Sequence, residues 1–80
     1  MEYYTYIVRC SDNTLYTGIA TDLKRRISEH NGEGNLGAKY TKSRRPVELV
    51  YKKKFKNRSY ASKEEYRVKK LTRIEKEKLI

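Results

Sequence analysis

Hydrophobic and polar positions alternate near the start of the chain, and this alternation predicts a β-strand over residues 3–10. Aromatic and β-branched residues dominate the stretch, as is typical of strands. Ser11, Asp12 and Asn13 follow as a turn, and Asn13 tolerates the left-handed backbone conformation that closes a three-residue hairpin loop. Residues 14–20 are therefore predicted to return as a second, antiparallel strand.

The length of that loop decides which side chains share a face of the predicted sheet. A three-residue loop pairs Cys10 with Thr14. In that register Tyr6 lies opposite Gly18, and Tyr6 and Tyr16 point to the same face. A two-residue loop would place the two tyrosines on opposite faces. The turn residues favour the longer loop, and with it a shared face.

Apolar positions then change to helical spacing, which predicts a helix that ends at His30. Leu23, Ile27 and His30 recur on one face, and residues 31–32 provide a stop signal. Thr21 is the expected N-cap, because a threonine hydroxyl accepts hydrogen bonds from the free amides of the first turn. The sequence thus predicts a strand, a turn and a helix in direct succession.

Arg26 lies four residues before His30, so the two side chains stack beside the apolar stripe of this helix. A cation and an imidazole at the edge of a buried face are explained by a solvated rim. They are also suited to a functional site. The spacing alone leaves both interpretations open.

The second half of the chain predicts one more strand and two helices. Residues 32–45 are expected as a flexible loop with a basic end, and residues 47–55 alternate as a third strand. Ser59 is the expected N-cap of a helix to about Lys70, and residues 72–75 form a capping box that opens a last helix. One face of the third strand would carry Val47, Leu49, Tyr51, Lys53 and Phe55. The order β-β-α-β-α-α predicts an α+β fold, a three-stranded antiparallel sheet flanked by helices.

Length and charge narrow the possible functions. The 80 residues are predicted to form a single domain, residues 1–80, with a thin core, because only 36% are apolar and none is tryptophan. The 20 Lys and Arg against 10 Asp and Glu give a net charge of +10, which favours a polyanionic partner. Residues 52–80 hold 12 of the basic and 4 of the acidic groups. No segment has the apolar length of a membrane anchor, so nucleic acid is favoured over a membrane.

Cysteine use and the N-terminal residues bear on the compartment. Cys10 is the only cysteine, which excludes a disulfide framework and a thiolate zinc cluster. Residues 1–4 have neither the basic start nor the apolar run of a signal peptide. We therefore expect a cytoplasmic protein, and a monomer.

Tyrosine chemistry is the most unusual feature of the composition, with eight tyrosines and one phenylalanine. A strand tyrosine usually buries its ring and keeps its hydroxyl in water. Two on one face, beside Arg26 and His30, suit phosphodiester hydrolysis, which needs a base or positioned hydroxyl, a cation and often a metal. A free tyrosine of pKa about 10 is ionised in only about one molecule in a thousand at pH 7. That leaves it about 4 kcal/mol short of a formed base, so the arginine or a metal must supply much of the difference.

A metal ion would need an oxygen ligand on an inward face. In the helix predicted from Ser59, Glu64 falls near the middle of the apolar arc and Glu65 at its margin. Periodicity does not choose between the two carboxylates. Glu65 is equally explained by a surface pair with Lys69, four residues on.

Two short tyrosine motifs and the helix after them resemble a known family. The first predicted strand contains Tyr4-Thr5-Tyr6, and the second contains Tyr16-Thr17-Gly18 about ten residues later. Arg26 follows on the first predicted helix. This arrangement resembles the GIY-YIG nuclease domain, and the whole chain is similar to its small stand-alone YhbQ/YazA-like group. The sequence departs from the pattern where Tyr4 stands for the first motif glycine and Ile19 for a lysine of the repair-nuclease branch.

The resemblance implies a fold and a set of site residues. The family's fold is a three-stranded antiparallel sheet flanked by helices, with the active site on one sheet face. By position, Tyr6 and Tyr16 are the motif tyrosines, one of them the general base toward water. Arg26 would stabilise the phosphate, His30 would assist, and Glu65 would hold a single divalent ion, Mg²⁺ or Mn²⁺. The resemblance thus selects this glutamate over its neighbour.

Two functions from different classes follow. The first is a metal-dependent GIY-YIG-type endonuclease that acts on DNA rather than RNA, in repair or recombination. Alone it would be weak or structure-selective, and a partner protein could direct it to its substrate. The second is a non-catalytic nucleic-acid-binding module that kept the fold. A carboxylate in a positively charged face favours the nuclease, because it would repel phosphate in a protein that only binds. The predicted nucleic-acid contacts are Lys24, Arg25, Lys39, Lys42, Arg44, Arg45, Lys69 and Lys70.

Binding of nucleic acid should depend strongly on salt and little on sequence, because the excess charge is lysine-rich and the chain has no recognition helix or zinc finger motif. If about four to six phosphates are neutralised, affinity should fall tens- to thousands-fold between roughly 50 and 200 mM salt. Titrations of labelled duplexes of different sequence at several salt concentrations measure this. A flat salt response, or a strong preference for one sequence, would contradict the prediction.

Overall fold

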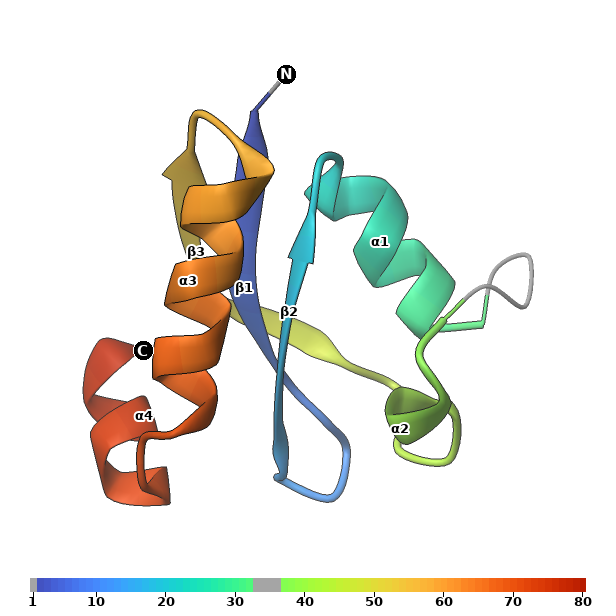
Figure 1. The fold of residues 1–80 in the computed structure, drawn as a ribbon. Helices are drawn as coiled ribbons and strands as arrows, with labels where there is room; N and C mark the ends of the chain where they lie inside the picture. Colours follow the sequence, from blue (N-terminus) through green and yellow to red (C-terminus); the bar gives the residue numbers. More distant parts are fainter. Residues whose placement is uncertain (1, 33–36) are drawn as a thin grey trace.

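An antiparallel sheet of three strands lies at the centre of the structure (Figure 1). The computed structural model describes residues 2–32 and 37–80. Its elements are β1 (Tyr3–Arg9), β2 (Leu15–Ala20), α1 (Leu23–His30), α2 (Lys39–Lys42), β3 (Glu48–Phe55), α3 (Arg58–Lys69) and α4 (Arg73–Leu79). The strands lie in the order β2-β1-β3, and both pairs are antiparallel. The predicted α+β fold and its order of elements are confirmed, with α2 as an addition.

The register predicted for the first hairpin is confirmed. Asn13 has a φ of +69°, the left-handed conformation that the three-residue loop requires. Tyr6 of β1 lies opposite Gly18 of β2, and Val8 lies opposite Tyr16. Because side chains alternate along a strand, Tyr6 and Tyr16 therefore share one face of the sheet.

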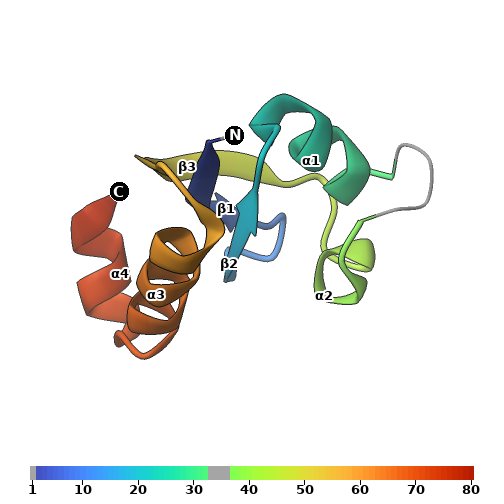
Figure 2. The same cartoon turned by 45° about the horizontal axis from the view of Figure 1, so that its top comes forward.

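The two faces of the sheet carry different helices (Figures 1 and 2). On the α1 side, a core forms from Tyr6, Val8, Cys10 and Val47 with partly buried Tyr16, Ala20, Leu23, Ile27 and Leu49. On the other side, α3 packs mainly across β1 and β2, and the buried Thr5 hydroxyl donates to the carbonyl oxygen of Ala61 over 2.8 Å. Among the described helices α3, with 12 residues, is the longest, and none could cross a membrane.

The continuous apolar face predicted for the third strand is wrong beyond the first half of β3. Val8 lies opposite Leu49, whereas Ile7 lies opposite Tyr51, so Val50 is an extra residue in the pairing. An extra residue in one strand is a β-bulge, and it moves every later side chain to the other face. Leu49 thus packs in the core beneath α1, while Tyr51 turns toward α3.

Two of the predicted helix caps are also wrong, by one or two residues. Asp22, not Thr21, caps α1, with its carboxylate accepting from the amide of the third helical residue. Asn57, not Ser59, caps α3 in the same way. Both observed caps carry a side-chain oxygen two bonds from Cβ. As N-caps, Asp and Asn stabilise a helix at least as well as Ser or Thr. The capping box over residues 72–75 is confirmed.

The segment predicted to be a flexible loop contains the short helix α2, so that prediction is wrong for residues 39–42. Residues 33–36 of the same segment lie outside the described residues. Gly32 has a φ of +108°, as expected of the predicted stop after α1. Arg45 Nε donates to the carbonyl oxygen of His30 over 2.7 Å, which ties the end of the segment to the end of α1.

Substitution of Gly18 should lower stability, because its missing side chain leaves room for the Tyr6 ring. A Cβ atom at Gly18 would lie 2.6 Å from Tyr6 Oη and 2.8 Å from Cζ. Without that contact, Gly18→Ala in a strand would stabilise by about 0.5–1 kcal/mol. We expect it instead to cost about 1–3 kcal/mol, as overpacking does. Denaturant unfolding measures the change.

The matched control is the same substitution in a Tyr6→Ala background, where the clash is absent. There Gly18→Ala should be neutral or stabilising, and the double-mutant cycle gives the coupling energy between the two positions. Equal costs in both backgrounds would show that the Tyr6 ring is not what Gly18 accommodates.

Candidate active site

The Tyr6 hydroxyl is the point at which the predicted site residues meet. The side chain starts on β1, crosses over Gly18 of β2 and is 1% exposed. Tyr6 Oη lies 2.7 Å from Nε2 of His30, the last residue of α1. The Arg26 guanidinium, one turn earlier on α1, interacts with the same hydroxyl. The edge strand β2 and the helix that follows it thus bring an imidazole and a cation onto one phenol oxygen.

His30 is fully buried, and its contacts assign its proton to one ring nitrogen. The amide of Ala38 donates to Nδ1 over 3.3 Å, and an amide N–H can only donate, so Nδ1 acts as an acceptor. Thr41 Oγ1 lies 3.0 Å from the same nitrogen and also donates to the carbonyl oxygen of Ala38. With Nδ1 as acceptor, the proton of the neutral ring is on Nε2 and is donated to Tyr6 Oη.

The titration of these groups follows from burial. Burial, with the nearby charge of Arg26, lowers the pKa of His30 to about 4, so the ring is neutral at pH 7. Burial also raises the pKa of Tyr6 to about 12, against the opposing effect of Arg26. Tyr16 and the carboxylate of Glu65 make smaller contributions to this upward shift of the Tyr6 pKa. The phenol is therefore neutral at pH 7 and keeps its own proton.

Tyr16 reaches the same site from β2. Its ring packs edge-on against His30, with 5.4 Å between ring centroids. On α2, Tyr40 stacks with Tyr16 at 5.6 Å and carries the Arg44 guanidinium 4.1 Å from its ring centroid. The aromatic contacts fix the orientation of Tyr16, and they bring α2, a helix that was not predicted, to the site.

Arg26 is held by an acidic neighbour on its own helix. One of its guanidinium nitrogens, Nη1, donates to Glu29 Oε1 over 2.9 Å, and Arg25 Nε lies 3.7 Å from Oε2 of the same carboxylate. Glu29 is a positioning residue that the sequence analysis missed. The Arg-x-x-Glu spacing was the available signal, because residues three apart are neighbours on a helix.

The structure distinguishes the two glutamates that periodicity left open. Glu64 is buried and accepts two hydrogen bonds from Arg67, at 2.8 and 2.7 Å, and one from Tyr51 at 3.3 Å. The hydrogen bonds from Arg67 hold the pKa of Glu64 below its usual range. Glu65 keeps 25% of its side chain exposed and pairs with Lys69 over 3.3 Å. Glu64 thus holds α3 to β3, and Glu65 is the carboxylate that lies near Tyr6.

The donor set suits magnesium. Within residues 2–32 and 37–80, no three His, Cys, Asp or Glu side chains gather in a way that could hold a metal. Zn²⁺ sites need such clusters, whereas Mg²⁺ keeps several waters and is often held by one or two carboxylates together with substrate phosphates. A single partly exposed carboxylate at Glu65 therefore fits a hard divalent ion that takes its other ligands from water and substrate.

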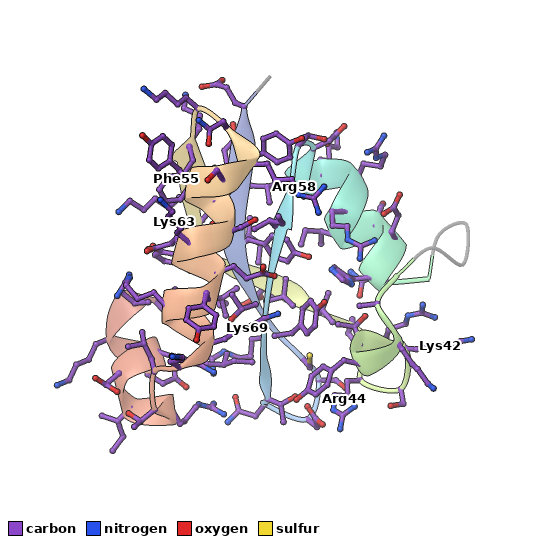
Figure 3. All side chains as sticks on the ribbon, viewed as in Figure 1. Lys42, Arg44, Phe55, Arg58, Lys63 and Lys69 are labelled. Carbon is purple, nitrogen blue, oxygen red and sulfur yellow. The ribbon has the colours of Figure 1, made fainter. Side chains whose placement is uncertain are left out.

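The predicted nucleic-acid contacts fall into two groups. Arg44 and Arg45 are engaged within the protein: Arg44 Nε lies 3.1 Å from Asp12 Oδ2, and Arg45 binds the end of α1. The exposed basic residues of the predicted set are Lys24, Arg25, Lys39, Lys42, Lys69 and Lys70, of which Arg25 and Lys69 each form an ion pair at the surface. In Figure 3, Lys69 extends from α3 toward the side of α1 and α2, whereas Lys42 lies on the outer side of α2. Lys24 lies two positions from Arg26, on a different flank of α1.

Comparison with known proteins shows which family the chain belongs to. A family model described as the GIY-YIG catalytic domain matches residues 2–78. The chain belongs to the GIY-YIG family. Its relatives include a UPF0213 protein from Desulfotalea psychrophila, 53% identical over 78 residues, which cover 98% of this chain and 70% of that protein.

Solved structures place this GIY-YIG chain among the same relatives. A UPF0213 protein from Bacillus halodurans, solved by solution NMR, is 44% identical with a TM-score of 0.62, over 99% of this chain and 82% of that one. A protein from E. faecalis, also solved by NMR, is 40% identical with a TM-score of 0.64, over 99% and 83%. The family and its fold are confirmed, and the catalytic roles of the motif residues stay predictions.

The buried His30 of this GIY-YIG site should make stability depend on pH. Its pKa is about 4 in the folded chain and about 6.5 when unfolded. Between these values the unfolded state binds more protons, so the free energy of unfolding should rise with pH, by about 3 kcal/mol from pH 4 to 6.5. Urea unfolding at a series of pH values measures the slope.

His30→Gln supplies the control, because His30 is the chain's only histidine. The variant should lose the slope between about pH 5 and 6.5, where ordinary carboxylates contribute little. An NMR titration of the imidazole with a midpoint near the ordinary histidine value would contradict the assignment of a buried neutral ring.

Proposed function

We propose that this protein hydrolyses phosphodiester bonds in nucleic acid, DNA in preference to RNA, with one divalent metal ion. The observation that carries the proposal is the meeting of Tyr6, Tyr16, Arg26 and His30, together with the half-buried carboxylate of Glu65, whose charge acts on Tyr6. These residues come from β1, β2, α1 and α3, so four elements of the fold contribute to one site. Membership of the GIY-YIG family supports a nuclease-type function.

In this reaction the Tyr6 phenol first releases its own proton to solvent, and the resulting anion accepts a proton from the attacking water. His30 Nε2 and Arg26 both direct positive character at the phenol oxygen, so each stabilises the anion that accepts a proton. A pKa of about 12 leaves the phenol roughly 7 kcal/mol from full ionisation at pH 7. Further positive charge must therefore reach the site with the substrate.

Arg26 and Glu65 have complementary roles at the scissile phosphate. The guanidinium, kept in place by Glu29, lies where it can stabilise the negative charge that develops on the phosphate. Glu65 would hold the divalent ion, which supplies positive charge to the phosphate and the leaving oxygen. Lys69 pairs with this carboxylate and would be available to the backbone of the nucleic acid if Glu65 held the ion instead.

Glu65→Gln tests the proposal, because it removes the anionic ligand and keeps the volume of the side chain. Metal-dependent cleavage of supercoiled and branched DNA should be abolished with Mg²⁺ or Mn²⁺. Binding should stay unchanged or become slightly tighter, since the face loses a negative charge. Stability should change by less than about 0.5 kcal/mol, because the pair with Lys69 is a surface helix pair. Cleavage rate, binding constant and Tm are measured on the pure protein.

Glu64→Gln is the matched control on the adjacent position. It breaks the buried hydrogen bonds with Arg67 and Tyr51, so it should cost about 1–2 kcal/mol of stability. Below its Tm it should cleave at the wild-type rate. Equal loss of cleavage in both variants, or no metal-dependent cleavage by the wild type on any of these substrates, would favour a module that only binds nucleic acid.

A further inference from the structure

A pocket of about 290 Å³ is lined in part by Arg26. The start of α1, the end of β2 and the start of α3 enclose it. Its lining includes Tyr3, Thr21, Arg25, Arg26 and Arg58. Three arginines in one pocket indicate a negatively charged ligand.

The charges in this pocket are not fully neutralised. Glu29 and Asp22 also line it, but both are engaged: Glu29 is bound by Arg26 and Arg25, and Asp22 caps α1. Arg58 is exposed, and its side chain forms no hydrogen bond or ion pair with any residue that the structure describes. The pocket therefore has an excess of positive charge, and Arg58 is its uncommitted group.

Arg58 lies in line with the residues of the proposed site along α3. Arg58, Glu65 and Lys69 are spaced by seven and four residues, which places them on one stripe of the helix. Figure 3 shows Arg58 and Lys69 on the side of α3 that faces α1 and α2, with Lys63 on the other side. At about 1.5 Å per residue, Arg58 lies roughly 10 Å along the axis from Glu65, the span of about three nucleotides at 3.4 Å each.

We propose that this pocket is a phosphate subsite, in which Arg58 and Arg25 bind the non-bridging oxygens of a phosphate about three nucleotides from the scissile bond. The planar guanidinium fork matches two oxygens of one phosphate. Because Arg26 belongs both to the pocket and to the proposed site, a nucleic-acid strand bound in the pocket has its scissile phosphate placed near Glu65. The position of this phosphate relative to the scissile bond rests on the proposed function. The binding of a phosphate in the pocket does not depend on it.

Binding of DNA without metal tests the subsite independently of cleavage. Arg58→Ala should weaken the binding of a labelled oligonucleotide about five- to tenfold at 0.1 M salt, and should reduce the slope of log K against log[salt] by about 0.7–0.9, the loss of one phosphate contact. Lys63→Ala is the control, because it removes the same charge from the opposite side of α3. It should change both quantities far less.

A phosphate scan locates the contact. Single methylphosphonate groups, which carry no charge, are placed at successive positions of a strand with a known cleavage position. A methylphosphonate at one position, about three nucleotides from that bond, should weaken binding to the wild-type protein as much as Arg58→Ala does. The same methylphosphonate should not weaken binding to the Arg58→Ala variant any further. Oligonucleotides with and without a 5′-phosphate show whether the pocket takes an internal phosphodiester or a terminal phosphate.

The outcomes separate the two proposals. Equal effects of Arg58→Ala and Lys63→Ala, or a scan in which no position couples to Arg58, would overturn the subsite. A coupled position in a protein that never cleaves would support the subsite and overturn the proposed nuclease. A terminal phosphate that couples to Arg58, with no internal position doing so, would overturn the register but keep a phosphate site.

Discussion

The hydrogen bond between Tyr6 and His30 is the contact on which both the fold and the candidate site depend. Tyr6 reaches it by crossing over Gly18, which has no side chain to block the ring, and His30 reaches it from the end of α1. Ala38 and Thr41 hold the other ring nitrogen. One chain of contacts thus joins β1, β2, α1 and α2. Leaving either buried group unpaired would cost about 1–3 kcal/mol, a large share of the stability of a small domain.

The same burial that stabilises this contact opposes the chemistry proposed for it. Removal of water raises the pKa of the Tyr6 phenol to about 12 and favours its neutral form. Arg26 acts in the opposite direction, but Glu65 adds negative charge nearby. In the proposed nuclease a divalent ion at Glu65 would reverse the sign of that last contribution. The arrangement is therefore consistent with a site that is inactive until its carboxylate is occupied.

Local rules predicted the parts of this structure that depend on neighbouring residues. The turn ending at Asn13 sets the hairpin register, and the register alone places Tyr6 and Tyr16 on one face. The choice between Glu64 and Glu65 was beyond periodicity, because both lie near the same arc of α3. Arg67 and a long-range contact with β3 engage Glu64, whereas the family resemblance selects Glu65 as the metal ligand, which stays a prediction.

What the sequence could not predict depends on contacts between distant segments or on the exact start of a helix. The bulge at Val50 and the contacts of α2 with Tyr16 depend on contacts between distant segments. The place of Arg58 depends on where α3 begins. A helix capped by Ser59 would leave Arg58 in a turn, with no defined face. Because Asn57 is the true cap, Arg58 is the first helical residue, and the phase of α3 places it on the stripe of Glu65. A two-residue shift of one cap thus decides whether this arginine belongs to the surface that faces α1.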